Sequence, residues 1–324
     1  MRKGYLALVL HAHLPFVRHP EYPEFLEEDW LFEGITETYV PLWQAFEGLL
    51  RDGIPFRLTM SLTPTLCAML DDELLRERYL RYLDRAIALS KREIDRTQSQ
   101  PEINHLARIY HSRFLECREI YVDRLKCDLV RAFRRFQDHG ILEIITCAAT
   151  HGFLPLMEEH PEAVRAQILI ARDEYKKAFG RKPRGIWLPE CAYFAGLENY
   201  LQEAELRWFS MDAHGLMFGN PRPRYAIYAP CFTPAAFGRD CESAKQVWSQ
   251  REGYPGDPAY RDFYRDIGHD LDAEVSPTVS AIRRIKKIHR HYDQLVSGTV
   301  DEAILQNCEW RDNLFPGLNW QYYV

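Results

Sequence analysis

The stretch of sequence that decides the fold is Gly185-Ile-Trp-Leu-Pro-Glu-Cys191. Its apolar first half has the composition of a β-strand. Pro189 must end that strand, because proline has no backbone N–H to donate to a sheet. The next side chain is the carboxylate of Glu190. Because α/β barrels carry their chemistry at the carboxyl ends of the strands, this position makes Glu190 a candidate catalytic residue.

Two other predicted strand ends carry histidines. The apolar run at 5–10 leads into His11 and His13, which point to the same side because side chains alternate along a strand. The apolar run at 141–147 ends shortly before His151. Because these ends meet at one rim of a barrel, the three segments predict a site of imidazoles around a carboxylate.

Four segments of the chain resemble a known enzyme family. The first three signature regions of glycoside hydrolase family 57 resemble HAHLPF at 11–16, CAATHGFLP at 147–155 and GIWLPECAY at 185–193. A loop of that family's 1,4-α-glucan branching enzyme subgroup resembles VWSQREGYPGDPAYRDFYRDIG at 247–268. The resemblance implies a (β/α)7 barrel, a retaining mechanism without a metal, and Glu190 as the nucleophile.

The resemblance also implies side chains that grip an α-glucan. We expect substrate-binding residues at six positions: His11, His13, His151, Trp187, Arg261 and Arg265. Most aromatic residues are expected in the core, since aromatic rings dominate core burial. Two tryptophans outside the strand pattern, Trp30 and Trp43, are further candidates for contact with a sugar face.

The carboxyl-terminal part departs from the family's pattern. Residues 278–316 resemble the extreme carboxyl terminus of branching enzymes, yet they follow directly on residues 265–274. The family's general-acid aspartate and a tryptophan-rich segment normally lie between these two regions. The sequence therefore indicates an internal deletion with a junction near 272–278. Two aspartates are candidates to replace the acid: Asp212, which follows a predicted strand, and Asp272.

Strands and helices alternate along the chain in the manner of an α/β barrel. The predicted strands span residues 4–10, 56–61, 141–147, 185–188, 206–210 and 225–229. A helical insertion is predicted at about 71–139, with Pro101 between its two arms, and residues 215–258 are expected to be mostly loop. The predicted domains are a (β/α)7-type barrel over 1–270, complete or lacking its last strand, and a helical remnant over 278–324.

The composition of the chain narrows the functional classes. Its 324 residues are 46% hydrophobic, which is enough for one large core. The net charge of −6 gives no reason to expect nucleic acid, and no apolar run reaches the roughly 20 residues of a membrane helix. Eight cysteines without a CxxC pair, and no signal peptide, predict a cytoplasmic protein. A barrel that lacks a strand would expose a sheet edge, so self-association is expected.

The predicted function is 1,4-α-glucan branching through a covalent glycosyl-enzyme on Glu190, with doubtful turnover because the acid is missing. The alternatives are a degenerate barrel that only binds α-glucan, and a 4-α-glucanotransferase or α-amylase of the same family. A metal-dependent carbohydrate deacetylase is a further alternative, because His-x-His is a frequent zinc arrangement. A zinc site of this kind needs another metal-binding side chain near the end of the first strand. The residues there are Ala12 and Leu14, which cannot bind a metal through their side chains. We therefore expect no metal and no cofactor.

Overall fold

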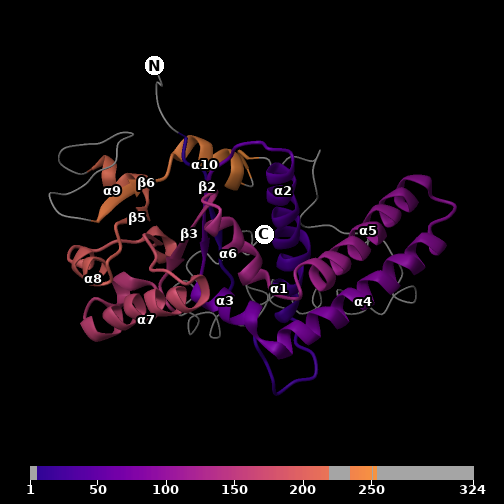
Figure 1. Cartoon of the computed structure of the whole chain (residues 1–324), viewed down its shortest axis with the longest axis horizontal. Coiled ribbons are helices and arrows are strands. Elements are labelled where there is room, and N and C mark those ends of the chain that lie inside the picture. The colour runs from indigo at the N-terminus through magenta and orange to yellow at the C-terminus, as the bar shows by residue number, and fades with distance from the viewer. Residues whose placement is uncertain (1–5, 219–233, 250, 254–324) are drawn as a thin grey trace, which may run out of the picture. The chain divides into compact units, whose positions relative to one another are not determined.

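Six parallel strands form the centre of the molecule (Figure 1). The computed structural model describes residues 6–218, 234–249 and 251–253. The strands are β1 (Val9–Ala12), β2 (Leu58–Leu62), β3 (Leu142–Cys147), β4 (Gly185–Trp187), β5 (Trp208–Met211) and β6 (Ala235–Gly238). They lie side by side in the order of the sequence, and every neighbouring pair is parallel. Sequential parallel order is the topology of a β/α barrel, so the predicted fold class is confirmed.

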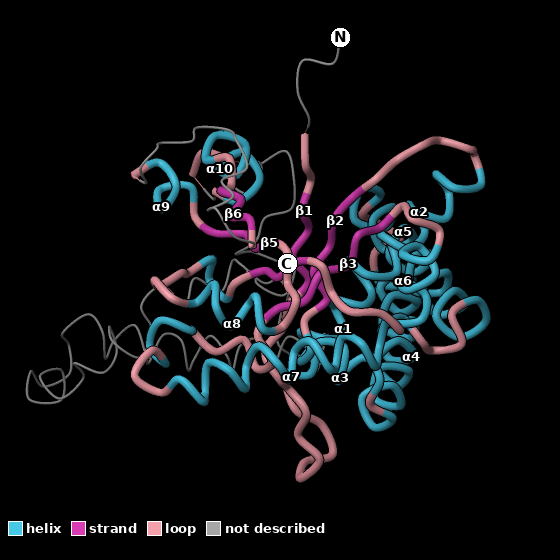
Figure 2. The backbone as a smooth tube through the Cα atoms, turned by 60° about the vertical axis from the view of Figure 1, so that its left-hand side comes forward, coloured by secondary structure: helices cyan, strands magenta, loops and turns pink. Residues whose placement is uncertain are grey.

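Helices connect the strands in the βα alternation that the sequence predicts (Figure 2). After β1 come α1 (Glu28–Gly34), a π-helix (Ile35–Tyr39) and α2 (Val40–Arg51). After β2 come α3 (Pro64–Asp71), α4 (Glu73–Arg96), α5 (Pro101–Glu119), a second π-helix (Ile120–Arg124) and α6 (Leu129–Asp138). The later strands are followed by a 3₁₀ turn (Leu154–Met157), α7 (Pro161–Phe179), a 3₁₀ turn (Pro189–Cys191), α8 (Leu197–Glu203) and α9 (Ala213–Met217).

The segment expected to be loop contains regular structure. Residues 215–258 include β6 and most of α9, and the helix α10 (Cys241–Trp248) also lies within them. The strand β6 was not predicted because Ala-Ala-Phe-Gly is short and poor in β-branched residues, so it gives little strand signal. The predicted strand at 225–229 lies outside the described residues. The chain divides into two compact units, and α10 belongs to the second, Asp240–Tyr322, whereas the sheet belongs to the first.

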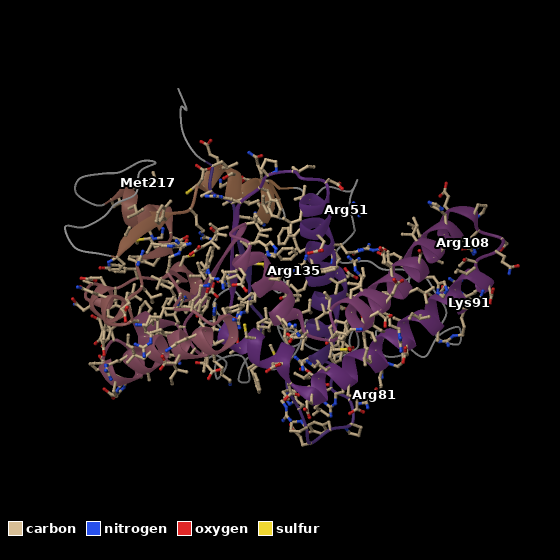
Figure 3. All side chains as sticks on the ribbon, viewed as in Figure 1. Arg51, Arg81, Lys91, Arg108, Arg135 and Met217 are labelled. Atoms are coloured by element: carbon tan, nitrogen blue, oxygen red, sulfur yellow. The ribbon has the colours of Figure 1, made fainter. Side chains whose placement is uncertain are left out.

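The helical insertion is a hairpin of α4 packed on α5 (Figure 1). Asp72 caps α4 by accepting a hydrogen bond from the backbone N–H of Leu75 at 3.0 Å. Pro101 starts α5, where the missing N–H of proline does no harm. Figure 3 shows Lys91 on α4 and Arg108 on α5 near the end of the hairpin that is remote from the sheet. Both cations are exposed, so they belong to a solvated helix surface.

The second arm of the insertion is shorter than predicted. Lys126 and Cys127 adopt positive φ angles of 54° and 59°, which break the helical run expected to continue to 139. Asp128 then caps a new helix, α6, by accepting a hydrogen bond from the N–H of Arg131 at 2.8 Å. Since α6 packs against β3 and α7, it belongs to the helical layer around the sheet rather than to the hairpin.

The largest core cluster lies between the first three strands and the helices that follow them. Phe133 and Phe136 of α6 are fully buried there, and Phe46 of α2 meets Phe136 edge to face at 5.4 Å. Trp43 belongs to the same cluster with only 4% of its surface exposed. The prediction that Trp43 contacts sugar is therefore wrong, because its ring is covered by protein, with the Arg124 guanidinium 4.6 Å away. No helix in the described part of the chain has both the length and the apolar character needed to cross a bilayer.

A buried ion pair fixes the long segment between β1 and α1. Glu28 and Arg78 are bonded side chain to side chain, with exposed fractions of 1% and 7%. Arg78 also donates to the backbone carbonyls of His19 and Tyr22, and Glu28 accepts from the backbone N–H of His19 at 3.2 Å. The pair thus binds the segment that follows His13 to helix α4.

We expect the substitution Arg78→Met to lower the free energy of unfolding by about 3–5 kcal/mol, because it leaves the Glu28 carboxylate buried without its partner. Denaturant unfolding followed by circular dichroism measures this change. The matched control is Arg81→Met, one turn further along α4, which removes the solvent-exposed pair with Glu77 and should change the free energy by less than ~0.5 kcal/mol. Equal effects of the two substitutions would contradict the assigned role of the buried pair.

Candidate active site

The register of β1 on β2 places two histidines opposite two hydroxyl groups. His11 pairs with Ser61 across the sheet, and the Nδ1 of His11 lies 2.6 Å from the Ser61 Oγ. Two residues further, at the carboxyl ends of the same strands, the Nδ1 of His13 lies 3.2 Å from the Thr63 Oγ1. Thr63 also caps α3 by accepting from the backbone N–H of Leu66. Each imidazole is therefore held through its Nδ1 by a side chain of the neighbouring strand.

The rings of His11, His13 and His151 form one cluster. The His13 and His151 rings stack with centroids 3.6 Å apart, and the His11 centroid lies 5.6 Å from that of His151. On its other side, His11 stacks on the indole of Trp187 at 4.5 Å. Only 6% of the surface of Trp187 is exposed, so little of its ring is open to solvent beside the contact with His11. A direct contact between Trp187 and a sugar stays a prediction.

Glu190 lies beside this cluster, in the 3₁₀ turn that follows β4. Its Oε1 is 3.8 Å from the Nε2 of His151, and its side chain is 69% exposed, so the carboxylate faces the open side of the site. Both residues adopt left-handed backbone conformations, with φ of 53° at Glu190 and 57° at His151. Such conformations are strained for residues with a Cβ and are frequent at functional sites. Cys191, next to Glu190, shares this conformation with a φ of 54°.

Two buried cysteines lie under the site. The Sγ of Cys147, at the end of β3, is 3.1 Å from the Nδ1 of His151. Burial raises the pKa of the Cys147 thiol well above its usual range and raises that of Cys191 to about 12. Both thiols therefore stay protonated at neutral pH. The cysteines of the described residues are all free.

The electrostatics of the site favour neutral rings at His11 and His13 and a charged carboxylate at Glu190. Desolvation, helped by His151, lowers the pKa of His13 from 6.5 to about 3. The pKa of His11 is also well below 6.5, mainly through desolvation, although part of this residue is exposed. The nearby His151 imidazole and then the Arg239 guanidinium hold the pKa of Glu190 below its usual range, against the opposing effect of desolvation.

Asp212, a candidate for the missing acid, is paired with an arginine. It follows β5, as predicted, and its Oδ1 accepts hydrogen bonds from both Nε and Nη2 of Arg239, the former at 3.1 Å. Its backbone N–H donates to the carbonyl of Cys191 at 3.3 Å, which links it to the turn of Glu190. The hydrogen bonds from the guanidinium occupy one oxygen of this carboxylate. The pairing therefore disfavours Asp212 as a proton donor.

Several predicted site residues cannot be placed. Arg261, Arg265 and Asp272 lie outside the described residues, as do the junction near 272–278 and the helical remnant at 278–324. Within the described ranges, no group of three or more histidine, cysteine or acidic side chains has the arrangement of a metal site.

Three residues of this site were not predicted from the sequence. Ser61 and Thr63 end the second strand in the same alternating pattern as the two histidines of the first, and that pattern was a usable signal. Arg239 directly follows β6, a strand that the sequence did not reveal. Its position could therefore not be inferred.

Known proteins resemble this chain in sequence and in fold. The sequence model of glycosyl hydrolase family 57 matches residues 7–290. The chain belongs to glycosyl hydrolase family 57. It is 35% identical to the 1,4-alpha-glucan branching enzyme TK1436 of Thermococcus kodakarensis, over 93% of this chain and 50% of the relative. The chain thus spans about half the length of the curated relatives that it matches.

Solved structures of the family resemble this chain closely. The alpha-amylase AmyC from Thermotoga maritima is 45% identical with a TM-score of 0.78, and the match covers 84% of this chain and 52% of AmyC. The branching enzyme from Pyrococcus horikoshii is 32% identical with a TM-score of 0.76, over 91% of this chain and 59% of the enzyme.

We expect the low pKa of His13 to make the folded state sensitive to acid. Because this pKa is about 3 in the folded chain and near 6.5 in the unfolded chain, the unfolded chain binds more protons between these values. Stability should therefore fall as the pH falls from about 6.5 towards 3, by up to ~1.4 kcal/mol per pH unit for this one group. Urea unfolding of the wild type and His13→Asn at pH 7 and 5 measures the difference.

The variant His13→Asn should lose less stability between these two pH values than the wild type. The control is His105→Asn, which changes an exposed histidine of α5 and should keep the wild-type dependence on pH. An unchanged pH dependence in His13→Asn would show that His13 is not held neutral by the fold.

Proposed function

We propose that this chain acts on α-1,4-glucans by glycosyl transfer, with Glu190 as the nucleophile of a retaining reaction. The observation that carries the proposal is the exposed Glu190 carboxylate at the end of β4, with the Nε2 of His151 3.8 Å from its Oε1. A nucleophile for a sugar carbon must be ionised, and the lowered pKa of Glu190 favours that form. His11 and His13 lie beside His151 and would bind hydroxyl groups of the sugar.

Branching is the favoured outcome of this transfer, and glycogen or amylose the favoured substrate. The proposal is supported by likeness to proteins described as 1,4-alpha-glucan branching enzymes in Thermococcus kodakarensis and Pyrococcus horikoshii. In such a reaction the covalent glycosyl-enzyme is attacked by a glucan hydroxyl rather than by water. We place this chemistry in the cytoplasm, where the free cysteines of the described residues would remain reduced.

The proposed mechanism also requires a general acid. A retaining enzyme needs a second carboxyl group, about 5–5.5 Å from the first, to protonate the leaving oxygen. We infer from the sequence pattern that an internal deletion near 272–278 has removed the family's aspartate for this role. Asp212 is paired with Arg239, and Asp272 remains a candidate. If neither replaces the acid, the chain binds glucan without efficient turnover, and its incomplete barrel could self-associate.

Hydrolysis is the second candidate, and the likeness to AmyC favours it. This protein is described as an alpha-amylase, and its identity of 45% exceeds that of the branching enzyme structures, at 31–32%. Hydrolysis and branching share the glycosyl-enzyme and differ only in the acceptor. They are distinguished by whether the products of amylose are shorter chains or new α-1,6 branch points.

The proposed nucleophile is tested with α-glucosyl fluoride. Fluoride leaves without protonation, whereas the oxygen of a glucan needs a proton whose transfer is worth ~10²–10⁴ in rate. We therefore expect the chain to form a covalent glucosyl adduct on Glu190, visible by mass spectrometry of the intact protein and its peptides, and to be nearly inert on amylose.

The variant Glu190→Gln should form no adduct, and it should keep the fold because the side chain is exposed. Glu198→Gln is the matched control, since it alters another carboxylate shortly after β4 and should leave the adduct unchanged. An adduct that persists in Glu190→Gln would exclude Glu190 as the nucleophile. Efficient branching of amylose by the wild type would show that an acid is present after all.

A further inference from the structure

The hydrogen bonds of Ser61 determine where its proton lies. Ser61 is fully buried, and its Oγ accepts a hydrogen bond from the backbone N–H of Ala12 at 3.1 Å. The hydroxyl must then direct its own proton to an acceptor, because an unsatisfied buried donor is costly. Among the described residues, the Nδ1 of His11 is the acceptor bonded to it, at 2.6 Å. Nδ1 of His11 is therefore unprotonated, and in the neutral ring the proton is on Nε2.

The same reasoning applies to Cys147 and His151. The thiol of Cys147 is fully buried and protonated, and its Sγ lies 3.1 Å from the Nδ1 of His151. A second observation comes from the other side of the ring, where Nε2 faces the carboxylate oxygen of Glu190 at 3.8 Å. A proton on Nε2 is attracted by that oxygen, whereas a lone pair on Nε2 would be repelled by it. Both contacts favour the same tautomer of His151.

Thr63 does not fix the proton of His13 in this way. Its Oγ1 lies 3.2 Å from both the Nδ1 of His13 and the Oγ1 of Thr65, so its proton has two acceptors. The inference is therefore limited to the pairs formed by Ser61 and Cys147.

We propose that Ser61 and Cys147 are positioning residues that fix His11 and His151 as tautomers with the proton on Nε2. The consequence rests on the proposed function: the Nε2–H of His151 stabilises the charged Glu190 nucleophile, and the Nε2–H of His11 donates to a sugar hydroxyl. Orienting groups behind a functional imidazole have this role in many sites, where their loss typically lowers affinity or activity by about 10–100-fold. The two buried donors, Ser61 and Cys147, thus determine that the protonated Nε2 atoms of the two rings face the carboxylate and the sugar.

The tautomers can be determined without an activity measurement. In the wild-type chain labelled with ¹⁵N-histidine, NMR correlations distinguish a protonated from an unprotonated ring nitrogen, and the variants His11→Gln and His151→Gln assign the signals. We expect Nδ1 to be unprotonated and Nε2 protonated in both residues at neutral pH. A proton on Nδ1 of either ring overturns the assignment for that pair.

The role of Cys147 is then tested by substitution. In Cys147→Ala the donor is lost, so we expect His151 to become a mixture of tautomers and the glucosyl-fluoride reaction to slow by about 10–100-fold. The acid limb of its pH profile should also move to higher pH, because Glu190 loses the Nε2–H that favours its charge. Cys147→Ser keeps a donor and should restore the tautomer and the rate. A purely structural role of Cys147 would leave the tautomer and the pH profile unchanged.

The role of Ser61 is tested with Ser61→Ala and Ser61→Thr, of which only the second keeps a hydroxyl donor. The control is Ser90→Ala, because Ser90 lies 3.0 Å from the Nδ1 of another histidine, His111, within the α4–α5 hairpin. That variant should leave the tautomer of His11 and the reaction unchanged. If the wild type forms no adduct but its tautomers are as expected, the proposed function fails while the positioning holds. If adducts form with equal rates in Ser61→Ala and Ser61→Thr, the positioning fails.

Discussion

The register of β1 against β2 is the constraint on which the site depends. It pairs His11 with Ser61 and continues into the contact of His13 with Thr63. Because side chains alternate along a strand, a slip of one residue would turn both histidines to the opposite face of the sheet. The apolar residues Ala12 and Leu62, buried between them, hold this register because the slip would expose them. Burial of the core therefore sets the positions of the polar groups.

The second constraint is the backbone conformation at the ends of β3 and β4. His151 and Glu190 both have positive φ angles, which cost about 1–3 kcal/mol each in a residue with a Cβ. The surrounding turns hold them: the N–H of His151 donates to Ala148 at 3.1 Å, and that of Cys191 donates to Leu188 at 2.8 Å. The strain at these positions is thus offset by buried neighbours and aims the two side chains at each other.

The sequence predicts the parts of this structure that arise from periodic burial. The runs before His151 and Glu190 are apolar because their strands are covered, so the ends of these strands could be located. The run before His11 is different: Leu6 and Leu8 are exposed, and β1 begins only at Val9, so the strand predicted at 4–10 is shifted towards the histidines. The sequence could not predict β6, since its small residues gave no pattern, and therefore could not place Arg239. It also could not predict that Trp43 is buried, because exposure of an aromatic ring on a helix depends on what packs against it.

The balance of charge at the site follows from these same elements. Stacked rings such as His13 and His151, 3.6 Å apart, could not both be charged without strong repulsion, and desolvation together with His151 lowers the pKa of His13. Arg239 is engaged with Asp212 and, after His151, also lowers the pKa of Glu190. The carboxylate of Glu190 is therefore held in its charged form on the exposed side of the described site. A site of that polarity favours a transition state in which positive charge develops on a sugar carbon, which is the state that the proposed reaction requires.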